Sequence, residues 1–175
     1  MTEAALLLFL LPSVATAEPP LTVCEVLSNL KVYHGQTISV RGELEEALEW
    51  ISLKPHGCTV KVRIEDRDWP PAIFVTFPGT QEAKHVDFEV DRGSFATMRK
   101  AFAGDDIAGK RRIHIATFVG MLQSKLTVVP FGPGRRGVIG YGHLGAFAAM
   151  LVVKTVKDPV VIVVDEATPK SKYKW

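Results

Sequence analysis

Apolar and polar residues alternate in short runs along most of the chain, and this period of two restricts the possible folds more than any other feature. Successive side chains of a β-strand point to opposite faces, so such runs are typical of strands with one buried and one exposed face. In the first run, Ile38, Val40 and Leu44 share one face. These runs, together with several mostly apolar segments, predict strands at residues 37–44, 50–53, 60–64, 73–77, 85–91, 113–122, 126–129, 151–156 and 160–164.

The segments between these runs carry turn and loop residues. Residues 33–36 predict a turn, and residues 45–50 predict a hairpin rather than one more helical turn. Residues 65–71 are charged and contain proline, which is typical of a loop. Gly120 allows a bend within its long strand, and residues 157–159 should separate the last two strands.

Helical periodicity is found at only two places. Thr22 and Glu25 form a capping-box pattern, which predicts that a helix begins there and runs over residues 23–29. Ser94 is expected to cap the second helix, over residues 94–103, with Gly104 placed to end it. The apolar stripe of this second helix consists of Phe95, Met98 and Phe102.

The order of these elements predicts a mainly β, or β-rich α+β, fold. Alternating strand–helix units with a parallel sheet are excluded, because so few helices are expected. The order fits an OB-fold-like antiparallel barrel with an N-terminal helix and one internal helix. In the OB layout, that internal helix lies between the third and fourth barrel strands.

The N-terminus has the pattern of a signal peptide. Residues 4–11 are uninterruptedly apolar, and residues 15–17 read Ala-Thr-Ala, the small-residue pattern that signal peptidase reads. Cleavage after Ala17 would leave residues 18–175 as one domain in the periplasm or outside the cell. No basic residue precedes the apolar run, which a misplaced start at Met1 would explain. The alternative is a buried N-terminal helix; no run is long enough to span a bilayer.

The chain contains two cysteines, Cys24 and Cys58. In an oxidising compartment, two such residues favour a disulfide. The alternative is that both cysteines are free buried thiols, and export of the chain makes this alternative less favoured than the disulfide. Closing a loop of this length would stabilise the fold by roughly 3–4 kcal/mol.

Several segments resemble known sequences. The segment at residues 33–43, with a turn glycine followed by an alternating strand ending in Arg-Gly-Glu, is similar to the first barrel strand of OB-fold proteins. Three others, at residues 23–27, 69–73 and 140–156, resemble a family of exported bacterial proteins with no assigned activity. The resemblance implies export and a barrel-like fold, and it implies no activity.

Patterns that carry chemistry in other proteins have simpler interpretations here. Gly132, Gly134 and Gly137 satisfy a dinucleotide-binding spacing, but no helix is expected to follow, so a hairpin loop is favoured. His85, Asp87 and Glu89 share a predicted strand face but lie too far apart to chelate one ion, so a solvated edge is favoured. No serine-hydrolase elbow occurs. Neither a metal nor a cofactor is expected.

Charge is divided unevenly along the chain. Residues 18–107 contain 10 Lys and Arg against 15 Asp and Glu, whereas residues 108–175 contain 11 against 3. Arg135 and Arg136 lie in a glycine-rich loop of the basic half, and Tyr141 and His143 lie in a turn just after it. Guanidinium groups pair with carboxylate or phosphate, so these four residues form the predicted anion-favouring surface.

These observations predict an exported, non-catalytic binding or structural module of the bacterial cell envelope. Its partner would be an envelope protein, a glycan or a small anionic ligand, and export removes the usual nucleic-acid partners. Two alternatives remain. One is an envelope hydrolase that uses His143, although a satisfied histidine in a tight turn is the favoured interpretation of that residue. The other is weak binding of anionic polymers through the basic C-terminal half.

Overall fold

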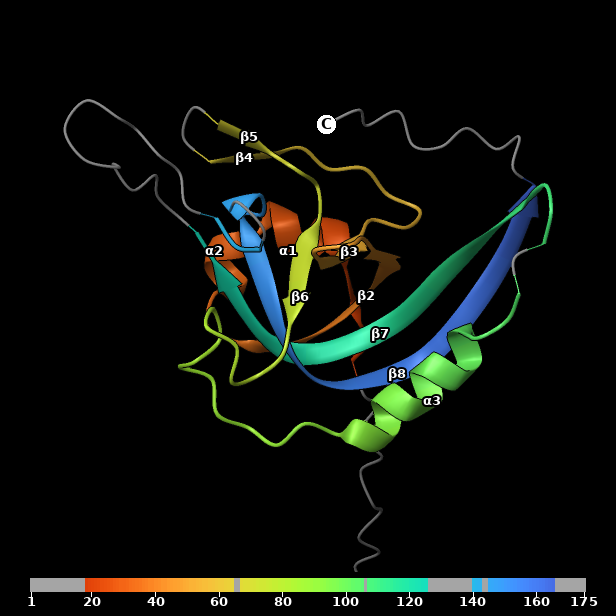
Figure 1. The fold of residues 1–175 in the computed structure, drawn as a ribbon. Helices are drawn as coiled ribbons and strands as arrows, with labels where there is room; N and C mark the ends of the chain where they lie inside the picture. The colour runs from red at the N-terminus through yellow and green to blue at the C-terminus, as the bar shows by residue number, and fades with distance from the viewer. Residues whose placement is uncertain (1–17, 65–66, 106, 126–139, 143–144, 166–175) are drawn as a thin grey trace, which may run out of the picture.

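The computed structural model describes residues 18–64, 67–105, 107–125, 140–142 and 145–165, and they form a closed barrel of five strands (Figure 1). Each barrel strand pairs with two neighbours, in the order β2-β3-β6-β8-β7, and β7 returns to pair with β2. All of these pairs are antiparallel except β6 and β8. The barrel strands are β2 (Thr37–Glu46), β3 (Ile51–Lys54), β6 (Ile73–Thr76), β7 (Lys110–Ser124) and β8 (Ala149–Asp165).

The remaining elements are short. β1 (Leu21–Thr22) pairs in parallel with β2, and β4 (Val62–Ile64) pairs only with β5 (Arg67–Trp69) in a separate ribbon. The helices are α1 (Val23–Ser28), α2 (Leu30–Tyr33) and α3 (Arg92–Phe102). Because α3 lies between the third and fourth barrel strands, the predicted OB-like barrel is confirmed. Within the described ranges, no helix is long and apolar enough to cross a bilayer.

Alternating side chains of the barrel strands fill its interior, as the period of two predicted. Along β2, buried and more exposed residues alternate over almost the whole strand. The largest of the fully buried side chains is Phe118 of β7. α1 adds Val23 and Val26 to the same core. A side chain on Gly42 would lie 2.7 Å from Cγ2 of Val23, so this glycine lets α1 approach the barrel.

The last barrel strand is one continuous element, not the two strands that were predicted. β8 pairs with β7 on both sides of residues 157–159. Asp158 has a φ of 48°, and the register shifts between Ile115 and Thr117. A bulge at this point therefore takes up the proline without ending the strand.

The predicted strand at residues 85–91 is wrong. Residues 86–91 form no regular element, and two successive turns precede them: the Ala83 amide donates to the Thr80 carbonyl, and the Val86 amide donates to the Ala83 carbonyl. Ala83 and Val86 are buried against the outside of the barrel. They therefore pack a turn onto the barrel and do not form the face of a strand. Alternation alone does not specify a strand where no neighbouring strand is within reach.

α3, the second of the two predicted helices, begins earlier than predicted, because Asp91 rather than Ser94 is its cap. The Asp91 carboxylate accepts a hydrogen bond from the Ser94 amide at 3.1 Å. The Ser94 hydroxyl instead accepts from the Val156 amide at 3.0 Å, which ties α3 to β8. Hydrogen bonds from Ser94 and Thr155 lower the pKa of Asp91.

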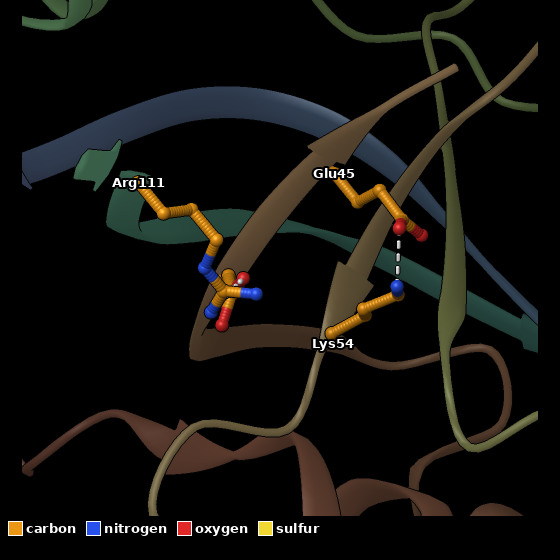
Figure 2. A network of polar contacts seen from close by, with 4 residues as sticks. Glu45, Lys54 and Arg111 are labelled. Atoms are coloured by element: carbon orange, nitrogen blue, oxygen red, sulfur yellow. Dashed lines mark hydrogen bonds and ion pairs between the residues drawn. The ribbon is translucent and has the colours of Figure 1, made fainter. Parts of the chain in front are cut away.

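The hairpin predicted at residues 45–50 is confirmed, whereas the predicted loop at 65–71 contains β5. Ion pairs surround the hairpin on the barrel surface (Figure 2). Lys54 pairs with Glu45 across β2 and β3, and Arg111 of β7 lies 3.7 Å from Glu43. Charges on this part of the surface are therefore matched within the chain.

His114 on β7 is an unusual member of the barrel. Its ring stacks on Phe102 with centroids 4.6 Å apart, and its Nε2 atom is buried without a hydrogen-bond partner among the described residues. Burial, and then the nearby charge of Arg112, lower the pKa of His114, although Glu46 and Glu43 act in the opposite direction. The folded protein therefore holds this ring neutral.

We expect the protein to lose stability as the pH falls below about 6.5, the ordinary pKa of histidine in an unfolded chain. In this window the unfolded chain binds a proton that folded His114 does not, so the free energy of unfolding decreases. Replacing His114 with Phe keeps the stacking on Phe102 and should reduce the slope of stability against pH. The difference between the melting temperatures at pH 7.5 and 5.5 measures this slope, and the exposed His85→Gln variant is the control. An unchanged slope in His114→Phe would contradict the assignment.

Candidate functional site

A second apolar cluster lies outside the barrel, on the face of β6 and β8. Along β6, Ile73 and Val75 belong to the barrel core, whereas Phe74 between them belongs to the outer cluster. Phe147 stacks on Phe74 with ring centroids 5.8 Å apart, and Trp50 packs edge-on against Phe147. The buried members are Ala72, Phe74, Ala83, Val86, Phe147, Met150 and Val152.

Two segments of the chain itself cover this face. Residues 83–88 contribute one part of the cover, and a narrow hairpin closed by Tyr141 and Phe147 contributes the other. Tyr141 and Phe147 exchange two backbone hydrogen bonds, of 2.8 and 3.1 Å. OB-folds commonly bind ligands on the face of their second and third strands, which here are β3 and β6. The chain's own residues thus cover the β6 part of the customary binding face.

Gly142 explains why the hairpin lies so close to the barrel. Its φ is +72°, and a side chain there would lie 2.9 Å from Cδ2 of Phe74 and 3.1 Å from Cδ2 of Phe147. The Gly142 amide donates to the Glu82 carboxylate at 2.8 Å, which joins the two covering segments. Gly142 is therefore required for close packing of the backbone on aromatic rings.

We expect Gly142→Ala to lose more stability than Gly79→Ala. Both glycines have positive φ, so each replacement should cost about 1–2 kcal/mol in backbone strain. Only Gly142 has neighbouring rings, since nothing lies within 4 Å of a side chain placed on Gly79. Chemical denaturation measures the difference, and hydrogen exchange at Tyr141 and Phe147 should accelerate only in Gly142→Ala. Equal stability of the two variants would contradict the packing role.

Of the four residues predicted to form an anion-favouring surface, the structure describes only Tyr141. Burial, and then the charge of Glu82, raise the pKa of Tyr141, and the Lys125 ammonium lies 4.8 Å from the centre of its ring. Arg135, Arg136 and His143 lie outside the described residues, as do the glycines at 132, 134 and 137. Tyr141 thus has a packing role in the cover.

A groove of about 680 Å³ lies at another part of the surface, between α2 and β4. Residues 27–32 line one side and residues 61–64 line the other; we call this the basic groove. Among the described residues, its lining contains Lys31, Lys61 and Arg63 and no carboxylate. Leu30 and Val62 are buried along it, whereas Val32 is 58% exposed. The basic groove therefore combines apolar walls with positive charge.

The cations of the basic groove have few partners among the described residues. Arg63 has one exposed partner, Asp68 at 3.7 Å, and the described residues provide no carboxylate for Lys31 or Lys61. Elsewhere, Lys110 pairs with Asp165, and Arg112 donates to carbonyls at the end of α3. The described cations of the basic C-terminal half are thus largely engaged locally, and the basic groove has charge available for a partner.

A disulfide between Cys24 and Cys58 fixes one end of the basic groove. The predicted bond is present, with the two Cα atoms 6.4 Å apart. Cys24 lies in α1, and Cys58 lies just before β4, so the bond ties the two walls together. The capping box of α1 is also present, with Thr22 and Glu25 each accepting a hydrogen bond from the other's backbone amide. The groove walls are therefore anchored to the barrel.

The described lining of the basic groove contains one hydroxyl, on Ser28. No histidine or carboxylate among those lining residues could act as its general base. No group of three potential metal ligands occurs within the described part of the chain. The predicted solvated strand edge of His85, Asp87 and Glu89 does not form, because those residues are not in a strand.

The sequence analysis did not identify the basic groove. Lys61 and Arg63 were visible as the polar face of a predicted strand, but nothing local indicated that α2 would lie opposite them. Comparison with protein-family models, with curated proteins and with solved structures finds no match for this chain. The functional argument therefore rests on the geometry and charge of its own residues.

Proposed function

We propose that the protein is an exported, non-catalytic binding module of the bacterial cell envelope that holds an anionic partner in the basic groove. The observation that carries this proposal is a set of three cations along a groove of about 680 Å³, whose described lining residues include no carboxylate. Ionic groups attract opposite charge most strongly beside low-dielectric walls, and Leu30 and Val62 supply such walls. A partner that brings carboxylates would complete the ion pairs.

Two further features support the proposal. The chain's own aromatic residues cover the β6 part of the customary OB binding face, whereas the basic groove is an open concave surface. The disulfide supports export, since such bonds persist in oxidising compartments. The signal-peptide pattern at residues 1–17 adds independent support, although those residues lie outside the described part.

Charge reversal in the basic groove tests the proposal. The double variant Lys61→Glu, Arg63→Glu should lose a partner that co-purifies with the oxidised protein from the bacterial envelope. The matched control is Lys84→Glu with Arg92→Glu, which changes the net charge equally at exposed positions outside the groove lining. The wild-type complex should also dissociate as salt is raised, since salt screens exposed charges. Equal retention of the partner by both double variants would contradict the proposal.

A further inference from the structure

The open edge of β4 indicates how a partner would lie in the basic groove. Four consecutive residues of this segment, 61–64, line the groove. Side chains of a strand alternate between faces, so four in succession line a groove that runs along the edge of the strand. Among the described pairings, β4 pairs only with β5. Its second edge therefore offers backbone donors and acceptors to the groove.

We propose that the anionic partner is an extended peptide segment that adds to β4 as a third strand of the β4–β5 ribbon. This inference rests on the proposed binding function of the basic groove. Addition of a strand to an exposed edge satisfies backbone hydrogen bonds and reads alternate side chains of the peptide. A glycan could match the charge, but it would lack the regular row of amides that pairs with a strand edge.

The side chains of β4 specify the pattern of that peptide. Lys61 and Arg63 are exposed on one face, whereas Val62 faces the core on the other. Arg63 already lies directly opposite Asp68 on β5. A carboxylate on the added strand would lie beside Arg63 on the side away from Asp68. The peptide residues between these carboxylates would contact the apolar wall near Leu30 and Val32. Acidic and apolar residues should therefore alternate along the peptide.

Synthetic heptapeptides test the inference directly on the oxidised full-length protein. One set alternates Glu with Val, Leu, Ile or Phe; a second replaces Glu with Lys; a third carries N-methyl groups on the amides of one edge. We expect the acidic set to bind, with affinity at least tenfold lower for the Lys and N-methylated sets. Bound peptide should slow hydrogen exchange at the β4 amides. Lys61→Glu, Arg63→Glu should weaken binding at least tenfold, whereas Lys84→Glu, Arg92→Glu should not.

The outcomes separate this inference from the proposed function. If N-methylated acidic peptides bind as well as unmodified ones, the groove binds anions but adds no strand, and only the further inference fails. If an acidic oligosaccharide binds through the groove cations and the acidic peptides do not, the further inference fails in the same way. If peptide and oligosaccharide both fail to bind, or bind equally to the groove-reversed variant, both proposals fail.

Discussion

Loss of the Cys24–Cys58 disulfide is expected to lower the free energy of unfolding by about 3–4 kcal/mol, as the chain-entropy description gives for a loop of this length. The bond restricts the unfolded chain, and in the folded protein it also ties α1 to the segment that leads into β4. The double variant Cys24→Ser, Cys58→Ser should therefore unfold at a lower denaturant concentration. It should also bind a groove partner more weakly, because one wall is released.

Reduction of the wild-type protein provides the control for this prediction. Wild type in dithiothreitol should unfold at the same denaturant concentration as the double serine variant, whereas the variant itself should not respond to dithiothreitol. If reductant leaves the wild-type transition unchanged while both thiols become labelled on unfolding, the stabilising role of the bond is wrong.

Replacing Phe118 with alanine is expected to lower the free energy of unfolding by about 3–5 kcal/mol. The Phe118 side chain is 1% exposed and lies in the barrel interior among residues from α1 and several strands. A cavity left by the ring would be enclosed by paired strands, which restrict local collapse. Urea unfolding with an unchanged m-value would report this loss as a change in stability.

Phe77→Ala is the matched control for the barrel core. Phe77 is 37% exposed and packs edge-on against Phe95 of α3, with ring centroids 5.1 Å apart. Its removal takes away the same number of atoms but leaves a space open to water, so the loss should be less than half that of Phe118→Ala. Comparable losses for the two variants would show that the barrel interior is not the main source of stability.

The sequence predicted the barrel well because alternation reports which strands have one buried face. The strand around Val40 follows from that pattern, whereas those around Ile73 and Phe118 were predicted from mostly apolar segments. The disulfide was predicted from the number of cysteines and the expected oxidising compartment. The same pattern misled at residues 85–91, where Val86 packs on the outside of the barrel in a turn. A period of two identifies amphipathic residues, but strand pairing also needs a neighbour within reach.

The candidate site depended on contacts that no local pattern contains. Lys31 and Lys61 are thirty residues apart in sequence, and they line one groove because α1 and the disulfide bring their segments together. The predicted site around Tyr141 was attractive because of its glycines, yet Gly142 serves the packing of a hairpin on Phe74. Glycine content indicates close approach of a backbone and does not identify what approaches.

The location of binding can be measured directly with a photocrosslinking amino acid placed at one of two exposed apolar positions. Val32 lines the basic groove and is 58% exposed, whereas Leu48 is fully exposed in the turn between β2 and β3, beside the customary OB binding face. In the bacterial envelope, the account predicts a crosslinked partner from position 32, none from position 48, and loss of the adduct when Lys61 and Arg63 are reversed to Glu. A partner crosslinked from position 48 and not from position 32 would contradict it.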